Sequence, residues 1–277
     1  MEISLTTNHL AEEAKRLRSP LSDPPNLTSH YTLVDHIADG GSSTVWSVRS
    51  KDNKLFACKI PYPDDEDFVL IESIYMKRIS QYPNASPFLT FYGLYEHEGS
   101  PVMVTELFQG EELAGLSDKI SQGLTAQLTN DEILHIAKCI LEQVVYLNNI
   151  GMCHGDIHNS NILYDGNRAV LIDITGDYTD PNDIHPTMLM TTDEYLNKAV
   201  DSNPLIWKKD IFDIGIVLRE LVVYDTNPIL YHDFVSKSDK YKIVSGCSKL
   251  DMVVNSALQL DISQRSSAKR MLRYVDE

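Results

Sequence analysis

The hydrophobic pattern of the chain changes its period near Gly110, and this change constrains the fold more than any other feature. Before Gly110 the apolar residues gather in short β-rich runs, at 31–38, 44–50, 55–60, 88–95 and 102–108. Turn-forming residues at 39–42 and 51–54 separate the first three runs, which predicts an antiparallel meander. Beyond Gly110 the apolar spacing is mostly helical. A sheet-rich part followed by a helical part predicts an α+β, bilobal fold with a cleft between the lobes.

Three segments have the apolar spacing of an amphipathic helix. The first follows the acidic turn at 64–67, and its predicted apolar face consists of Phe68, Ile71, Tyr75 and Ile79. The second begins at the capping-box sequence 129–132, and its apolar face consists of Ile133, Ile136, Ile140, Val144 and Leu147. The third spans 210–224, with Ile211, Ile214, Leu218, Leu221 and Val222 on one side. A further short helix is predicted at 8–18, and the polar, proline-containing residues 19–30 indicate a linker or a strap on the surface.

The composition restricts the classes of partner. The chain has 277 residues, of which 43% are hydrophobic, so it can form a sizeable core. Its formal net charge is −16 without a local basic patch, so we expect neither a nucleic-acid partner nor binding to an anionic membrane. No apolar run approaches the roughly 18 residues of a membrane-spanning helix, and the start has no signal-peptide pattern. The four cysteines lack the spacing of a zinc or redox motif, so reduced thiols in the cytoplasm are expected.

The strongest chemical signal is the polar loop 154–161, which reads His-Gly-Asp-Ile-His-Asn-Ser-Asn and directly follows the capped helix. Phosphoryl transfer needs a carboxylate that accepts the proton of the attacking hydroxyl. It also needs an amide and a second carboxylate to hold magnesium ions. Asp156 and Asn161 have a suitable spacing for these roles, and Asp173 follows after an apolar run. Taken alone, residues of these types in a polar loop are more often turn formers.

The order of the motifs along the chain resembles the protein-kinase family from about Tyr31 to Leu272. Ala57-Cys58-Lys59 resembles the strand motif whose lysine grips the α- and β-phosphates of ATP, and Glu72 stands where the ion-pair partner of that lysine is expected. Thr105 and Glu106 are similar to the gatekeeper and the hinge, whose backbone binds adenine. The residues for which the resemblance implies nucleotide contacts are Gly40, Gly41, Ser42, Val45, Ala57, Lys59, Thr105, Glu106, Phe108, Glu112 and Leu163. For Glu112, a solvated carboxylate at a helix start is an equal alternative.

In the second half of the chain, the resemblance implies that Asp156 is the catalytic carboxylate. It also implies that Asn161 and Asp173 bind the Mg²⁺ ions, with Mn²⁺ as an alternative metal. It also pairs Glu194 with Arg265 in a structural ion pair. The implied organisation is an extension at 1–30 and a kinase-like domain at 31–277, with an N-lobe at about 31–106 and a C-lobe at about 109–277.

Four departures from the family pattern stand out. Of the three expected loop glycines, aligned at 38, 40 and 43, only Gly40 is present, beside an additional Gly41. Gly155 replaces an arginine that gathers an activation-segment phosphate, which suggests that such phosphorylation is not needed. His158 stands where a lysine usually neutralises the γ-phosphate. The sequence Asp-Ile-Thr at 173–175 replaces Asp-Phe-Gly.

The resemblance implies an ATP- and Mg-dependent phosphotransferase, first of all a Ser/Thr protein kinase acting on protein substrates. Two alternatives stay open: a pseudokinase that serves as a binding module, and a small-molecule kinase similar to aminoglycoside phosphotransferases, whose loop also reads His-Gly-Asp-x-His. The compact size resembles minimal kinases of microbial, viral or injected-effector type, so delivery into a host cell stays open, as does the oligomeric state.

Overall fold

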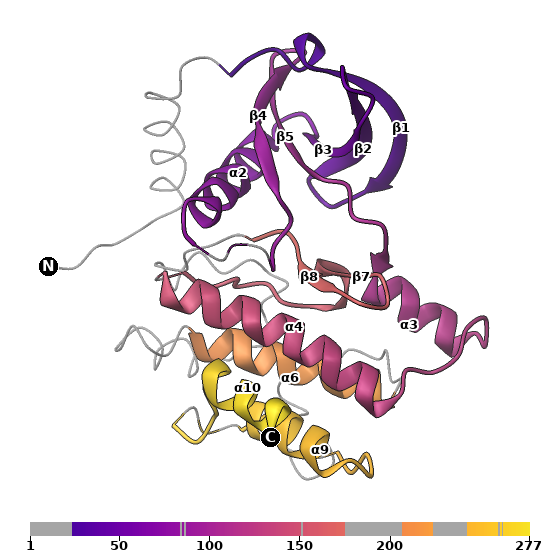
Figure 1. Cartoon of the computed structure of the whole chain (residues 1–277), viewed down its shortest axis with the longest axis vertical. Coiled ribbons are helices and arrows are strands. Elements are labelled where there is room, and N and C mark those ends of the chain that lie inside the picture. The colour runs from indigo at the N-terminus through magenta and orange to yellow at the C-terminus, as the bar shows by residue number, and fades with distance from the viewer. Residues whose placement is uncertain are drawn as a thin grey trace, which may run out of the picture. The chain divides into compact units, whose positions relative to one another are not determined.

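The computed structural model describes residues 24–83, 85, 87–150, 152–174, 207–223, 243–259, 261 and 263–277. The chain forms two compact units, Met1–Gln109 and Gly110–Glu277 (Figure 1). The predicted α+β class is confirmed, because the first unit holds an antiparallel sheet and the second is mainly helical. The helix predicted at 8–18, the residues of the predicted activation-segment motif at Asp193 and Glu194, and Thr175 lie outside the described residues.

Five antiparallel strands form the sheet of the first unit in the order β1-β2-β3-β5-β4. Their bounds are β1 (Tyr31–Asp39), β2 (Ser43–Ser50), β3 (Leu55–Pro61), β4 (Phe91–His97) and β5 (Ser100–Glu106). Both predicted turns connect these strands, and Asn53 in the second has a φ of 64°, a conformation that asparagine tolerates well. β4 begins later than the run predicted from residue 88, because Phe88 is buried in the loop before the strand.

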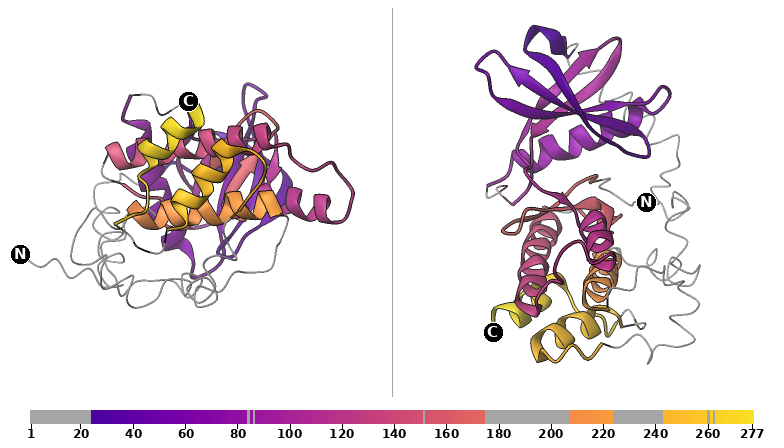
Figure 2. Two further views of the ribbon diagram at one scale, coloured as in Figure 1. Left: turned by 90° about the horizontal axis from the view of Figure 1, so that it is seen from below. Right: turned by 90° about the vertical axis from the view of Figure 1, so that its right-hand side faces the viewer.

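Helix α2 (Glu66–Ser80) packs against β3, β4 and β5 (Figure 2). The apolar face predicted for this helix is confirmed in part, since Ile79 is buried and Ile71 and Tyr75 are partly buried, whereas Phe68 is 51% exposed. The buried residues are Val69, Leu70, Glu72, Ser73, Met76 and Ile79. Two of them are polar, and the Ser73 hydroxyl donates to the Leu70 carbonyl at 2.7 Å. The helix therefore packs through a neighbouring, partly polar face whose hydrogen bonds are satisfied.

The described end of the N-terminal extension is a strap on the sheet. Asn26 pairs with Glu96 of β4, and the Glu96 N–H donates to the Pro25 carbonyl at 3.0 Å. The short 3-10 helix η1 (Leu27–Ser29) follows, and Leu27 is 0% exposed. Leu27 packs with four core residues of the sheet: Val48, Cys58, Val102 and Val104. The linker or strap was predicted for residues 19–30; the structure shows a strap at residues 24–30, and residues 19–23 lie outside the described residues.

The second unit contains β6 (Glu111–Glu112), α3 (Leu113–Ser121), α4 (Asn130–Asn149), η2 (Asn159–Asn161), β7 (Ile162–Tyr164), β8 (Ala169–Leu171), α6 (Trp207–Val223), α9 (Ser248–Ala257) and α10 (Ala268–Asp276). The capping box predicted for α4 is present, with Thr129 and Glu132 bonding reciprocally.

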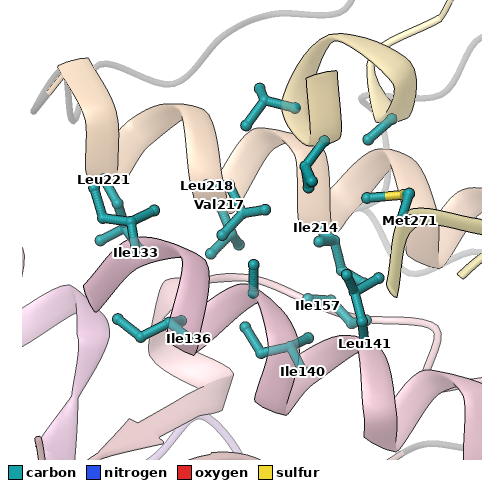
Figure 3. Packing of buried hydrophobic residues seen from close by; sticks show 14 of the residues in the cluster. Ile133, Ile136, Ile140, Leu141, Ile157, Ile214, Val217, Leu218, Leu221 and Met271 are labelled. Carbon is teal, nitrogen blue, oxygen red and sulfur yellow. The ribbon is translucent and has the colours of Figure 1, made fainter. Parts of the chain in front are cut away.

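The core of the second unit lies between α4, α6, α9 and α10 (Figure 3). All five residues predicted for the apolar face of α4 are buried, as are four of the five predicted for α6; Val222 is partly buried. Gly215 lets α6 approach α9 closely, because a Cβ there would lie 2.8 Å from the Ala257 Cβ.

In the part of the chain that the structure describes, the helices are all too short or too polar to cross a bilayer. The four cysteines, Cys58, Cys139, Cys153 and Cys247, are free thiols.

Candidate active site

In the first unit, Lys59 and Glu72 form a shielded ion pair. Lys59 lies on β3 between Val45 of β2 and Met103 of β5, so two neighbouring strands fix its backbone. Its Nζ is 2.7 Å from Glu72 Oε2, and the two side chains are 16% and 11% exposed. Partial burial strengthens such a pair relative to one in water. The pairing expected from the resemblance is thus present, and it holds a positive charge at a fixed place on the sheet.

The turn between β1 and β2 is closed by a hydrogen bond from the Gly40 N–H to the Ser43 carbonyl at 2.8 Å. The Ser42 carbonyl accepts from the Tyr62 N–H at 3.0 Å, which ties the turn to the residue after β3. A Cβ on Gly40 would lie 3.3 Å from the Ser43 oxygen, whereas one on Gly41 would meet nothing within 4 Å. Sterically, glycine is therefore favoured at position 40 and optional at position 41.

The end of β5 carries the residues expected to contact adenine. Ala57 pairs with Thr105, which is buried. The Glu106 carboxylate accepts the Thr90 N–H at 3.1 Å, and the Glu106 N–H donates to the Thr90 carbonyl at 2.8 Å. These bonds fix the chain just before the partly buried Phe108. A fixed backbone at this place is suited to hydrogen bonding with a flat heterocycle.

In the second unit, Asp210 of α6 anchors the polar loop 154–161. Its two carboxylate oxygens accept the His154 N–H at 2.9 Å and the Gly155 N–H at 2.8 Å. Burial raises the pKa of Asp210 to about 6, although both N–H donors favour the carboxylate. One side chain of α6 thus fixes two successive residues of the loop.

His154 connects the loop to the segment that carries Asp173. Its Nε2 donates to the Ile172 carbonyl at 2.9 Å, and its Nδ1 accepts the Asp156 N–H at 3.3 Å. These bonds assign the neutral tautomer with the proton on Nε2. Burial lowers the pKa of His154 to about 4, in agreement with a neutral ring. His154 therefore links the Asp156 N–H to the Ile172 carbonyl, just after β8, through hydrogen bonds from its two ring nitrogens.

Asp156, His158 and Asn161 are in contact. The Asn161 amide Nδ2 donates to the Asp156 carbonyl at 2.9 Å and to its carboxylate at 3.3 Å. His158 Nε2 lies 3.5 Å from the Asp156 carboxylate. The hydrogen bond with Asp156 raises the pKa of His158 against the effect of burial. Burial alone would raise the pKa of Asp156, but His158, with Lys209 and His154, holds it below its usual value.

Asp173 follows β8, whose position depends on the buried Gln143 of α4. Gln143 donates to the Ala169 carbonyl at 2.8 Å and accepts the Leu171 N–H at 2.9 Å. The Ile172 N–H donates to the Asn161 carbonyl at 3.0 Å, so the backbone joins both candidate metal ligands. Asp173 itself has a φ of 58°, in the left-handed region that is uncommon outside glycine but that aspartate adopts more readily than most residues.

Glu112 and Leu163 lie side by side on paired strands in the same unit. Leu163 is partly buried between Glu112 and Val170, its partner on β8. Burial and the neighbouring Asp173 raise the pKa of Glu112, and His158 opposes this rise. Glu112 therefore belongs to the electrostatic surroundings of Asp173, as a contact with a substrate or a ribose would require.

The donor set suits magnesium. Among the described residues, no group of three or more His, Cys, Asp and Glu side chains forms a closed metal site. Magnesium in phosphate-transferring sites instead takes one or two protein ligands together with waters and phosphate oxygens. Since Asn161 donates through Nδ2, its Oδ1 is the atom suited to a cation, and Asp173 adds a carboxylate. An amide oxygen and one carboxylate fit that type of site.

Two residues of this site were not found by sequence reasoning. Gln143 lies on the buried face of α4. Its spacing from Ile136 and Ile140 is the sequence signal that could have indicated this position. A polar residue at such a position signals a buried hydrogen-bond partner. Lys209 precedes Asp210 and donates to the Gly155 carbonyl at 3.0 Å. Its only sequence signal is a lysine at the start of an apolar helix.

Arg265 is buried in the second unit, and the predicted partner Glu194 lies outside the described residues. Its guanidinium donates twice to the Gln259 carbonyl, at 3.0 and 2.9 Å, and once to the Lys208 carbonyl at 2.8 Å. It also lies 4.7 Å from the ring centroid of Phe212. Arg265 therefore ties the segment before α10 to the start of α6.

Comparison with known proteins adds independent findings. The family model of the protein kinase domain matches residues 31–275. A probable serine/threonine-protein kinase of Dictyostelium discoideum is 25% identical over 258 residues, which cover 87% of this chain and 27% of that protein. The calmodulin-binding receptor-like cytoplasmic kinase 2 of Arabidopsis thaliana is 25% identical over 225 residues, covering 76% of this chain and 54% of that protein.

The serine/threonine-protein kinase sel-5 of Caenorhabditis elegans is 23% identical over an alignment of 278 positions, which covers 86% of this chain and 24% of that protein. The chain thus spans between about a quarter and about half the length of these curated relatives.

Proposed function

Because the chain belongs to the protein kinase domain family, matched over residues 31–275, we propose that it transfers the γ-phosphate of Mg–ATP to a serine or threonine hydroxyl of a protein. The observation that carries this proposal is the loop in which Asn161 bonds both the backbone and the carboxylate of Asp156, with Asp173 tied to Asn161 through the backbone of Ile172. The names of two of the relatives described above support the Ser/Thr class.

In the proposed reaction, Asp156 orients the acceptor hydroxyl and takes its proton. A bond forms between the hydroxyl oxygen and the γ-phosphorus, while the bond from that phosphorus to the β–γ bridging oxygen breaks. ADP leaves with the electron pair of that bond. The lowered pKa of Asp156 keeps it ionised and able to accept the hydroxyl hydrogen bond. His158, in contact with Asp156, is the side chain proposed to face the transferred phosphate.

Asn161 and Asp173 are proposed to hold magnesium, which supplies positive charge to the phosphate oxygens when it is bound. The chain itself keeps these two ligands in place through the Asn161 hydrogen bonds to Asp156 and the Gln143 bonds that position β8. Fixed ligands lower the reorganisation needed during the reaction. Mn²⁺ prefers similar oxygen ligands and is expected to substitute.

The first unit is proposed to bind the nucleotide. Lys59, held by Glu72, contacts the α- and β-phosphates, and the turn at Gly40, Gly41 and Ser42 covers them with backbone N–H groups. The remaining proposed nucleotide contacts are Val45, Ala57, Thr105, Glu106 and Phe108 from this unit, and Glu112 and Leu163 from the second.

We further propose that the activity does not require phosphorylation of the activation segment. Gly155 offers no side chain that could gather a phosphate. The loop is already fixed by the Asp210 carboxylate, which bonds the N–H groups of His154 and Gly155. An internal anchor of this kind gives the loop its order without a modification.

The test is transfer from γ-labelled ATP with Mg²⁺ to three kinds of acceptor: a basic protein, the chain itself and a panel of small alcohols. Label on protein that disappears in Asp156→Asn supports the proposal. Label on a small alcohol alone would establish a small-molecule kinase, the alternative that the loop sequence His-Gly-Asp-x-His suggests. No label on any acceptor, with no thermal shift on adding Mg–ATP, would establish a pseudokinase.

A further inference from the structure

Lys209 is a largely buried lysine that contacts the catalytic loop from α6. Its Nζ donates to the Gly155 carbonyl at 3.0 Å and also to the Asp213 carboxylate. The side chains of Lys209 and Asp213 are 14% and 16% exposed. Burial alone would lower the pKa of Lys209, but Asp213, together with Asp210 and Asp156, raises it. Lys209 is therefore a charged donor at a shielded place beside the loop.

The carbonyl that Lys209 contacts belongs to the peptide between Gly155 and Asp156. The N–H of this same peptide donates to His154 Nδ1 at 3.3 Å. Both polar groups of the peptide are thus bonded, one by Lys209 and the other by His154. Two bonds on opposite edges fix the plane of the peptide, and this plane, together with the φ of Asp156, sets the direction in which the Asp156 side chain leaves the backbone.

Gly155 makes such a restraint necessary. Its φ is 90°, in the region that glycine adopts without steric penalty. A glycine directly before Asp156 leaves the peptide free to rotate unless another group holds it. Asp210 restrains the N–H of Gly155, and Lys209 restrains its carbonyl. Two successive residues of α6 therefore hold the two sides of one glycine.

We propose that Lys209 is a positioning residue for phosphate transfer. Its ammonium fixes the Gly155–Asp156 peptide so that the Asp156 carboxylate points towards the acceptor hydroxyl. Lys209 acts through the backbone and contacts neither nucleotide nor acceptor. The kinetic part of this inference rests on the proposed function, whereas the structural part concerns the order of the loop alone.

Lys209→Met removes the donor and keeps most of the side-chain volume. We expect kcat to fall by on the order of 10–100-fold, because misplacing a catalytic group by about 1 Å can lower the rate by about 100-fold. The KM for ATP should stay within about threefold, since Lys59 and the metal ligands are untouched. Lys209→Arg keeps a charged donor and should recover at least about a third of the wild-type kcat.

The neighbouring Lys208 provides a matched control. It lies one residue earlier on α6, and its Nζ donates to the carbonyls of Arg265 and Ser266. Lys208→Met therefore removes the neighbouring lysine, which also donates to backbone carbonyls, without touching the loop, and its kcat should match wild type. If Lys209→Met does not fold because Asp213 is left without its partner, the double variant Lys209→Met, Asp213→Asn removes both charges and keeps the test valid.

Hydrogen exchange of the segment 152–158, followed by mass spectrometry, gives a readout that does not depend on activity. Exchange should be faster in Lys209→Met, or in the double variant, than in wild type and Lys208→Met. If the wild-type chain labels no acceptor, the proposed function fails, and hydrogen exchange alone decides on the loop. Unchanged exchange would overturn the inference, and so would a wild-type kcat in Lys209→Met or the double variant. A kcat for Lys209→Arg as low as that for Lys209→Met would likewise overturn it.

Discussion

The Asn161 side-chain amide donates to both the backbone carbonyl and the carboxylate of Asp156, at 2.9 and 3.3 Å. A turn-forming asparagine would bond the backbone alone, whereas this one also aims the carboxylate. The backbone carbonyl of Asn161 also accepts the Ile172 N–H, so this one residue joins the loop that carries Asp156 to the segment that follows β8. The predictions below follow from this contact and from the other contacts described within each unit.

Asp156→Asn is expected to lower kcat by about 10²–10⁴-fold, the usual contribution of a general base. The affinity for ATP should change little, because Lys59, Asn161 and Asp173 stay in place. Transfer from γ-labelled ATP and nucleotide binding by calorimetry check the two parts. Asp118→Asn, on the exposed side of α3, is the matched control and should behave as wild type. Equal turnover in Asp156→Asn and wild type would contradict the assigned role.

Lys59→Met is expected to lower kcat/KM for ATP on the order of 100-fold, because a preorganised charge on the phosphates is lost. Glu72→Gln keeps the shape and one acceptor oxygen but loses the charge that holds Lys59 at 2.7 Å, so a loss of about tenfold is expected. Steady-state kinetics over a range of ATP concentrations check both. Lys54→Met, in the exposed turn between β2 and β3, should leave kcat/KM unaltered. An active Lys59→Met variant would refute the phosphate contact.

Asp210→Asn is expected to change the pH dependence of the free energy of unfolding. The pKa of Asp210 is about 6 in the folded chain and 3.8 ordinarily. Between these values the folded chain binds a proton that the unfolded chain does not. The contribution of Asp210 to stability is therefore full below pH 3.8 and is lost as the pH rises through 6, a difference of roughly 3 kcal/mol.

Asparagine does not titrate, so the deficit of the Asp210→Asn variant should grow as the pH falls from about 7 to 4. Urea unfolding of both proteins across this range gives the two curves. Their difference cancels the titration of groups that do not interact with Asp210; Asp213, whose charge acts on Asp210, is not cancelled. A deficit that stays constant over the range would show that Asp210 does not have a raised pKa.

Arg265→Ala is expected to lower the free energy of unfolding by about 3 kcal/mol, because the Gln259 and Lys208 carbonyls lose charged donors in a buried place. Thermal melting measures the loss. Arg273→Ala, on the exposed side of α10, removes an arginine without such contacts among the described residues and should melt close to wild type. Equal melting temperatures for Arg265→Ala and wild type would show that these bonds do not stabilise the fold.

Helices α4 and α6 of the second unit follow closely from the sequence, because local signals and packing agree there. The capping box at Thr129 and the five apolar residues from Ile133 to Leu147 fix both the start and the buried face of α4. For α2 the apolar spacing selected Phe68, which is exposed. A periodicity measure ignores buried polar groups, whereas the contact between Glu72 and Lys59 requires a polar residue on the buried face.

The candidate site was predictable where a residue acts through its own chemistry. Asp156 and Asn161 were identified from residue type and spacing, and Lys59 and Glu72 from the resemblance to the kinase family; the structure brings each pair together. Residues that act through the backbone carried a weaker signal. Lys209 and Gln143 contact main-chain carbonyls that are distant in sequence, and main-chain groups are the same for every residue.

The strap at residues 24–30 shows that the folded N-terminal unit begins before the residues that match the family. The family match begins at residue 31, whereas Leu27 already lies in the core with Val48, Cys58, Val102 and Val104. A protein trimmed to the matched residues would leave a void at that place, comparable to a buried Leu→Ala change of about 2–5 kcal/mol. Homology marks where common ancestry becomes detectable, and here the cooperative structure starts upstream of that mark.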